Sequence, residues 1–212
     1  MKRVAAVALM CLTLGAGAGV VQTSGAAQAK PPAPEAMVRA TGDKLLARLR
    51  KDHAVLKAHP DRIYALVSDL LLPHFDFETM ARWVLGRYWR TATPAQRAQF
   101  VAAFRTLLVR TYATALLEYR NQDIRYLPFH GNPASGDVTV RTEVVQPGGR
   151  SIPIDYSLDL RDGRWMVYDV SVDGVSLVTT YRGSFASEIQ RVGMDGLLKK
   201  LAERNEQLSR RR

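Results

Sequence analysis

Cysteine is nearly absent from this sequence of 212 residues, which contains only Cys11. We expect Cys11 to be removed with an N-terminal leader, and a lipoprotein anchor there is disfavoured because too few apolar residues precede it. A mature chain without cysteine has no disulfide bond, thiolate metal ligand or thiol nucleophile. Its stability must come from a packed apolar core, which a single domain of this length can bury.

Common metal-binding and catalytic motifs are also missing. The four histidines, His53, His59, His74 and His130, show neither HxxxH nor HExxH spacing, so we expect no metal site. No GxSxG, Walker or GxGxxG motif follows the leader. We therefore expect no catalytic residue, no cofactor and no enzymatic activity.

One carboxylate keeps an enzymatic alternative open. Strand-like alternation places Asp169 on the predicted face of Trp165 and Val167, and a carboxylate buried there would have a raised pKa and could act as a general base. Tyr156 or Tyr168 would supply an oxyanion donor, as in a hydrolase or isomerase for a small hydrophobic substrate. The interpretation that we favour is structural: Asp169 pairs with an arginine or a backbone N–H at the rim of a sheet.

The first 29 residues are typical of a cleaved secretory signal. Residues 1–3 are basic, residues 4–21 are apolar and rich in small side chains, and residues 27–29 (AQA) fit a small-x-small cleavage site. A flexible Pro-rich lead is expected over residues 30–35. No later run reaches the roughly 18 apolar residues of a membrane helix, so we expect a secreted, soluble chain.

Positive charge exceeds negative charge. The formal net charge is +10, and +8 remains once Lys2 and Arg3 of the leader are removed, because residues 1–29 contain no acid. In a cytosolic protein this charge would suggest nucleic acid, which is not expected for a secreted chain. An anionic membrane surface or an acidic partner fits better, and a basic surface that serves only solubility is the other interpretation.

Helical periodicity runs through residues 36–120. The strongest start signal is Thr93-Pro94-Ala95-Gln96, in which Thr93 caps the helix and Gln96 reaches back to the cap. Asp61 and Asp76 are expected to cap two other helices, and Pro73 to end one of them. The predicted helices are residues 36–59, 61–72, 77–89 and 94 to about 119.

Residues 123–178 change to a period of two, which is typical of strands. Alternation predicts a curved antiparallel sheet of about four strands with one apolar face. C-terminal helices are expected over residues 181–208, with Asp195 capping the last. Helices, then a sheet, then helices indicate an α+β domain over residues 36–208. The strands are expected to begin at Ile124, Val138, Ile152 and Trp165, with turns at residues 130–133, 147–149 and 162–163.

Residues 165–185, WMVYDVSVDGVSLVTTYRGSF, organise the domain. They predict a strand, a corner and the beginning of a helix. A sheet that bends beside a helix can enclose an apolar cavity, and this geometry is the basis of the functional prediction.

Three segments together resemble the MlaC family, also called the toluene-tolerance auxiliary proteins. They cover most of the mature chain in the order of the family, and the family is not defined by catalytic residues. The segments are LLPHFDFETMARWVLGRYWRTATPAQRAQFVAAFRTLLVRTYATAL (residues 71–116), YDVSVDGVSLVTTYR (residues 168–182) and GMDGLLKKLAE (residues 193–203).

The resemblance implies an NTF2-like sheet and helices that enclose a deep apolar pocket. It also implies a soluble periplasmic carrier with phospholipid as its cargo. The partners implied are an outer-membrane MlaA-type lipoprotein with its porin, and an inner-membrane Mla ABC-transporter complex with its MlaD-type subunit. A periplasmic adaptor that binds only proteins is a further alternative.

The expected pocket would have a wall of aliphatic and aromatic side chains, although an ordinary solid core would use the same residues. Arg87 or Arg182 would meet the phosphate at the mouth, and a solvated surface role is the alternative for both. The candidate wall residues are Val84, Leu85, Tyr88, Phe104, Leu108, Tyr112, Val140, Ile154, Tyr156, Val167, Val175 and Val178.

Overall fold

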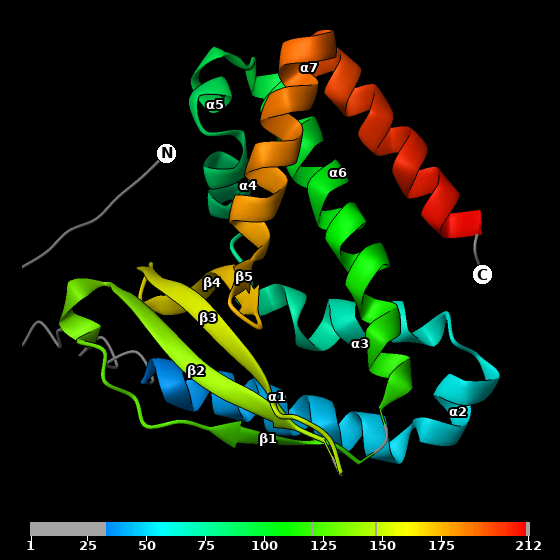
Figure 1. The fold of residues 1–212 in the computed structure, drawn as a ribbon, viewed down its shortest axis with the longest axis vertical. Helices are drawn as coiled ribbons and strands as arrows, with labels where there is room; N and C mark the ends of the chain where they lie inside the picture. The colour runs from blue at the N-terminus through cyan, green and yellow to red at the C-terminus, as the bar shows by residue number, and fades with distance from the viewer. Residues whose placement is uncertain (1–32, 120, 147, 211–212) are drawn as a thin grey trace, which may run out of the picture.

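The computed structural model describes residues 33–119, 121–146 and 148–210, and Figure 1 shows them as an antiparallel sheet beside helices. The predicted α+β class is confirmed. The predicted signal segment of residues 1–29, with Cys11, lies outside the described residues.

The first three helices occur where periodicity predicted two. The helix expected over residues 36–59 is divided at Asp52, and its first part begins earlier, at the buried Pro34. Asp61 occupies the N-cap position of the next helix without accepting a side-chain cap bond. The helices are α1 (Pro34–Lys51), α2 (His53–Ala58) and α3 (Arg62–Leu70).

Gly86 divides the helix that was predicted over residues 77–89. The predicted cap at its start is confirmed, because the Thr79 N–H donates to the Asp76 carboxylate at 2.8 Å. Gly86 has a φ of 53°, a conformation that glycine adopts without steric cost, and it ends α4 there. The segment therefore contains η1 (Leu72–His74), α4 (Phe77–Leu85) and α5 (Arg87–Thr91).

The next helix begins at the predicted capping box. The Gln96 N–H donates to the Thr93 hydroxyl at 3.1 Å, and the Thr93 N–H donates to the Gln96 side chain at 3.0 Å. The helix α6 (Pro94–Tyr112) continues as η2 (Ala113–Glu118). By length and hydropathy alone this segment could cross a membrane, and Phe100 and Phe104 on its apolar face are buried against other helices.

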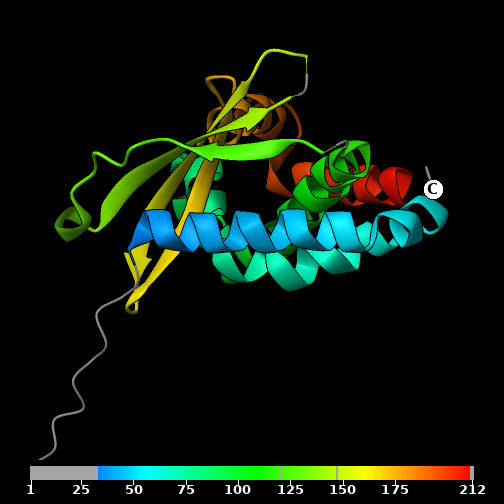
Figure 2. The ribbon, with the colours of Figure 1, turned by 90° about the horizontal axis from the view of Figure 1, so that it is seen from below.

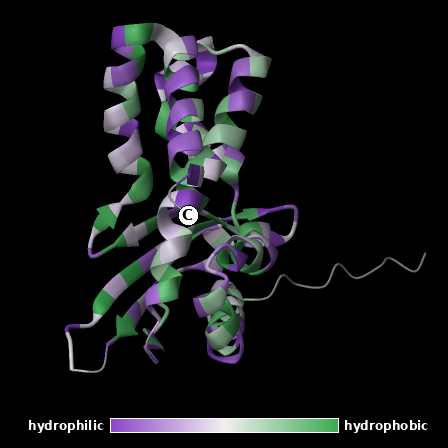
Figure 3. Ribbon diagram, turned by 90° about the vertical axis from the view of Figure 1, so that its right-hand side faces the viewer, coloured by the Kyte–Doolittle hydropathy of each residue, from purple (hydrophilic) through white to green (hydrophobic). Residues whose placement is uncertain are grey.

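The sheet has five strands in the order β1-β2-β3-β4-β5, one more than the approximate four predicted, and each pairs antiparallel with its neighbour. The additional strand has two residues. Figure 2 shows α1 lying across the sheet, and Figure 3 shows hydrophobic and hydrophilic residues alternating along the strands. The strands are β1 (Asp123–Tyr126), β2 (Asp137–Val145), β3 (Ile152–Arg161), β4 (Arg164–Val172) and β5 (Val175–Ser176), with η3 (Pro133–Ser135) before β2.

The last helix, α7 (Leu177–Arg210), bends at Gly193, whose φ is 74°. A new helical segment after Gly193 agrees with the prediction of a start near Asp195. The Asp195 carboxylate accepts a hydrogen bond from the Gln96 side chain at 2.7 Å, so it ties the bend of α7 to the beginning of α6.

Three separate clusters of buried side chains hold these elements together. The helical cluster joins α4, α6 and α7 around Phe100 and Phe104. A second cluster joins α1, α2 and α3 to the end of α6 around Ile63. The sheet cluster joins Val38 of α1 to the apolar face of β2, β3 and β4, with Leu158 at its centre. The helices and the sheet that were predicted to enclose a pocket are therefore held in place by three separate cores.

Candidate functional site

The predicted wall residues are divided between two buried clusters and several more exposed positions. Half of them belong to the helical cluster, where Val84, Leu85, Phe104, Leu108 and Val178 are buried and Tyr88 packs against them. Val140 and Val167 instead belong to the sheet cluster, together with the partly buried Tyr156.

The remaining candidates are more open to solvent. Val175 is 59% exposed and Tyr112 is 43% exposed, while Ile154 is half-buried on β3. Whether any candidate contacts a ligand stays a prediction.

Between α6 and α7 the helical cluster is filled by aromatic rings. Phe104 stacks with Phe100 at a centroid distance of 5.6 Å and meets Tyr181 edge-on at 5.2 Å. Phe185 meets Phe100 and Phe104 edge-on at 5.8 and 5.9 Å. Mutual contacts of this kind are those of a close-packed interior. Tyr181 and Phe185 were not among the predicted wall residues, although the sequence placed them at helical spacing.

A β-bulge in the pairing of β3 with β4 changes which residues of β4 face the apolar side of the sheet. Trp165 pairs with Leu160 and Val167 with Leu158, but beyond the bulge Val170 pairs with Tyr156. Since side chains alternate between faces, the register shift changes which residues face the apolar side. The prediction that Asp169 shares a face with Trp165 and Val167 is therefore wrong.

The apolar face of the sheet continues beyond the part that α1 covers. Ile154 and Tyr156 of β3 pair with Val172 and Val170 of β4, which places all four on the face of Leu158. Ile154, Tyr156 and Val170 are only half-buried, and Val172 is 40% exposed. A half-buried apolar face at the middle of a sheet is the feature expected of a surface that receives a hydrophobic ligand.

Tyr156 marks the inner end of this face. Its side chain retains some accessible surface, yet burial raises the pKa of its hydroxyl. The neighbouring Thr142 is 1% exposed and donates to the Ile154 carbonyl at 3.1 Å, so the only buried polar side chain on the described part of β2 is satisfied.

Asp169 has the structural role that we favoured. One carboxylate oxygen accepts from the Val170 N–H at 2.8 Å and from the Val178 N–H at 3.0 Å, and the other accepts from the Ser176 hydroxyl. The Ser176 hydroxyl in turn accepts from the Thr179 N–H at 3.0 Å. Asp169 therefore joins β4 to the N-terminus of α7, where a negative charge is favourable.

The proposed oxyanion donors do not meet Asp169. Asp169 pairs with Ser157 and so faces away from the side of Tyr156. The Tyr168 hydroxyl donates to the Asp137 carboxylate at 3.1 Å, and burial followed by the Asp137 charge raises the pKa of Tyr168 to about 12. These positions do not assemble a general base with an oxyanion donor.

Arg87 and Arg182 both lie at the joint between α4 and α5. Arg182 passes Gly86 so closely that a Cβ on this glycine would lie 3.4 Å from the guanidinium. Arg87 donates to the Tyr88 hydroxyl at 2.9 Å and covers the ring of Tyr88. Both arginines are exposed, and their contact with a phosphate stays a prediction.

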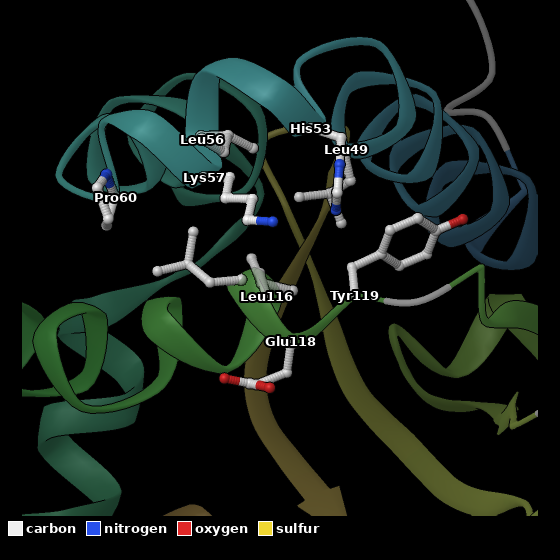
Figure 4. A pocket seen from close by; sticks show the side chains of 9 residues that line it. Leu49, His53, Leu56, Lys57, Pro60, Leu116, Glu118 and Tyr119 are labelled. Carbon is white, nitrogen blue, oxygen red and sulfur yellow. The ribbon is translucent and has the colours of Figure 1, made fainter.

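Two hollows open on the surface, and none of the predicted wall residues lines either. Figure 4 shows the first, of about 410 Å³, between α2 and η2. The second, of about 490 Å³, lies where η1 meets the β3–β4 turn. An enclosed deep pocket stays a prediction. The first hollow is lined by Leu49, His53, Leu56, Lys57, Pro60, Leu116, Leu117, Glu118 and Tyr119, and the second mainly by Leu72, Phe75, Phe77, Arg105, Arg161 and Arg164.

Metal binding receives no support from the part of the chain that the structure describes. Within it, no group of three His, Cys, Asp or Glu side chains could hold a metal ion.

Comparison with known proteins agrees on one family. The family model of the MlaC protein matches residues 39–203. The toluene tolerance protein ttg2D of Pseudomonas putida is 31% identical over 167 residues, which are 76% of this chain and 75% of the relative. The intermembrane phospholipid transport system binding protein MlaC of Haemophilus influenzae is 26% identical over 176 residues, 80% of this chain and 81% of the relative.

A solved structure shows the same fold. It is that of a phospholipid-binding protein from Ralstonia solanacearum in complex with a phospholipid, and it is 36% identical to this chain. The superposition has a TM-score of 0.76 and covers 82% of this chain and 98% of the other. With a matching family model over most of its length and these relatives, this chain belongs to the MlaC family.

Proposed function

We propose that this chain is a soluble periplasmic phospholipid carrier. It holds acyl chains against an apolar surface and moves lipid between membranes, which maintains the lipid asymmetry of the outer membrane. The observation that carries the proposal is the relative from Ralstonia solanacearum, which has the same fold over 98% of its length and is bound to a phospholipid. The leader predicted over residues 1–29 would deliver the chain to the periplasm.

The acyl chains are proposed to lie on the half-buried apolar face of β3 and β4. Ile154, Tyr156, Val170 and Val172 supply that face, and the deep pocket of the proposal begins there. Each methylene removed from water gains about 0.8 kcal/mol, so free acyl chains do not cross an aqueous space. Relative to a bilayer the gain is close to zero, because lipid tails are already out of water, and the exchange is therefore reversible.

The names of the relatives and the contacts of Asp169 favour a carrier over an enzyme. The names of the relatives describe lipid-binding transport proteins. Asp169 is engaged in holding α7, and no described partner completes a catalytic pair with it. In this proposal the phospholipid is cargo and no cofactor takes part.

The carrier is proposed to exchange lipid with two membrane complexes. One is an outer-membrane MlaA-type lipoprotein with its porin, and the other is an inner-membrane ABC-transporter complex with an MlaD-type subunit. The headgroup would remain at the mouth, where Arg87 or Arg182 would meet the phosphate. The net positive charge supports anionic partners and leaves nucleic acid without a role in a periplasmic chain.

Native mass spectrometry of protein purified gently from cells tests the proposal. The expected result is a species whose added mass equals a phospholipid. Ile154→Trp should reduce the lipid-bound fraction while the fold stays intact, because the larger ring fills a half-buried site. Val140→Trp is the matched control from the same sheet face: Val140 is 2% exposed, so overpacking should cost about 1–3 kcal/mol of stability. Recovery of only lipid-free protein would contradict the proposal.

A further inference from the structure

The indole of Trp83, on α4, is exposed to solvent. Trp83 of α4 is 53% exposed, whereas Trp89 is half-buried and Trp165 is 3% exposed. Figure 1 shows α4 and α5 on one side of α7, with α5 at the end of the helices farther from the sheet. The Trp83 ring belongs to none of the three cores.

Exposed arginines lie on the same helices as this indole and on the neighbouring α7. Arg82, Arg87 and Arg90 on α4 and α5 are exposed, and Arg182 of α7 joins them beside Gly86. Glu78 is the acid that contacts this group, through an exposed pair with Arg82 at 3.3 Å. Among the described residues, the guanidinium groups of Arg90 and Arg182 make no hydrogen bond or ion pair. We call these four arginines and Trp83 the Trp83 surface.

Aromatic rings hold part of this surface in place. The guanidinium of Arg82 lies 5.9 Å from the centre of the Trp89 ring, and that of Arg97 lies 5.3 Å from it. Arg97 also donates to the carbonyls of Trp89 and Arg90, at 2.8 and 3.3 Å, which fixes the end of α5. A surface that is ordered in advance loses less entropy when it binds.

We propose that the Trp83 surface binds directly to an anionic phospholipid bilayer. An indole is apolar with one polar N–H, which suits the interface between headgroups and acyl chains. Arginines beside it are attracted to an anionic membrane surface. A bilayer accepts the indole without a preformed pocket on either side.

The charges that face this surface from neighbouring elements do not cancel it. Glu188 of α7 is paired with Arg191 and Lys200, at 2.7 and 2.8 Å, so that group carries a net positive charge. On α6 the half-buried Arg97 adds to the positive side. The inference goes beyond cargo binding, because a bilayer can recruit the protein whether or not lipid is bound.

Vesicle co-sedimentation tests the inference with two compositions, phosphatidylcholine alone and phosphatidylcholine mixed with phosphatidylglycerol. The wild-type protein should bind the anionic vesicles, bind the neutral ones weakly, and lose affinity as salt is raised. The double variant Arg82→Gln with Arg90→Gln should lose affinity by roughly 25-fold, because each arginine near an anionic surface contributes about fivefold. Trp83→Ala should weaken binding with an unchanged salt dependence, and Trp83→Phe should restore part of it.

The matched control is Arg62→Gln with Arg141→Gln, which removes the same charge from exposed positions on α3 and β2. It should change vesicle affinity far less than the Arg82 and Arg90 pair. Equal binding to neutral and anionic vesicles, or equal losses in the two double variants, would overturn the inference. Capture of an acidic protein without any vesicle binding would also overturn it. Native mass spectrometry of bound phospholipid is a separate readout, so failure here is distinguishable from failure of the carrier function.

Discussion

Removal of the Asp169 carboxylate should weaken the junction between β4 and α7. Asp169→Ala deletes three acceptor contacts, with the Val170 and Val178 N–H groups and the Ser176 hydroxyl. Hydrogen bonds to a charged group contribute about 1.5–3 kcal/mol each, but three contacts to one carboxylate are not additive. Loss of a helix N-terminal acceptor alone costs about 0.5–2 kcal/mol. We expect Asp169→Ala to lower the free energy of unfolding by about 3 kcal/mol.

Asp169→Asn should cost less, about 1–2 kcal/mol. The amide oxygen can still accept from the Val178 N–H, and the amide NH₂ can face the Ser176 hydroxyl, which can accept. The negative charge near the first turn of α7 is lost in both variants. Urea unfolding followed by circular dichroism measures the difference, and an unchanged slope against urea would show that the unfolded state is unaffected.

The control is Asp155→Asn, in which an aspartate is neutralised on the adjacent strand. Asp155 pairs with Ser171 and faces the same side as Asp169, and its side chain makes no hydrogen bond or ion pair with the described residues. It should change stability by less than about 0.5 kcal/mol. Wild-type stability of Asp169→Ala would refute the assigned role. Turnover of a small hydrophobic ester that Asp169→Asn abolishes without destabilising the fold would establish the enzymatic alternative instead.

Three further predictions concern stability. Gly86→Ala should destabilise the protein by about 1–2 kcal/mol, because φ is 53° at this position. Gly183→Ala in α7 should stabilise it by about 0.5–1 kcal/mol, because a Cβ there meets open space. Urea midpoints that shifted in the same direction in both variants would contradict this. Burial, and then the charge of Lys44, lower the pKa of His74 below its ordinary 6.5. The free energy of unfolding should therefore fall as the pH drops from 6.5 through the lower folded pKa, because the unfolded state binds the proton first. His74→Gln should remove this pH dependence in a series of unfolding curves. Thr93→Ala should cost about 1 kcal/mol by thermal unfolding, and no change would mean that the capping box contributes nothing.

Local signals in the sequence predicted local structure well. The Thr93 capping box and the Asp76 cap occur where they were expected, because each depends on residues within one helical turn. The turn at residues 162–163 also joins two strands as predicted. Gly86 lies inside the span that was predicted as one helix, residues 77–89, whereas its positive φ ends α4, and helical periodicity alone does not show this break.

The facing of β4 shows why the site was harder to predict. Strict alternation from Trp165 placed Asp169 on the apolar face, but the bulge beside Leu158 inserts one residue and moves Val170 there instead. The signal was present, since Trp165 and Val167 are out of phase with Val170 and Val172. A change of phase between two apolar runs in one strand indicates a bulge, and it identifies the residues that continue the face.

Which residues line a common wall stays a prediction, for a different reason. Periodicity shows which side of an element is apolar, but it does not show which element that side meets. Phe104 and Val140 both have well-buried apolar positions, yet one packs among the aromatic rings of α6 and α7 and the other against α1. Only the tertiary arrangement separates these cores from the half-buried face around Ile154.

The separation of the cores has a consequence for a carrier. The helical cluster around Phe104 and the sheet cluster around Leu158 are both complete without the half-buried face of Ile154 and Val172. If lipid binds on the half-buried face as proposed, the protein should keep its fold when the cargo leaves, because Ile154 and Val172 belong to neither cluster. Bound lipid then adds stability only through mass action, by an amount that grows with the logarithm of its concentration relative to its dissociation constant. An unfolding transition that stays cooperative after delipidation, at a lower midpoint, is therefore expected, whereas loss of cooperativity would place the lipid inside the core itself.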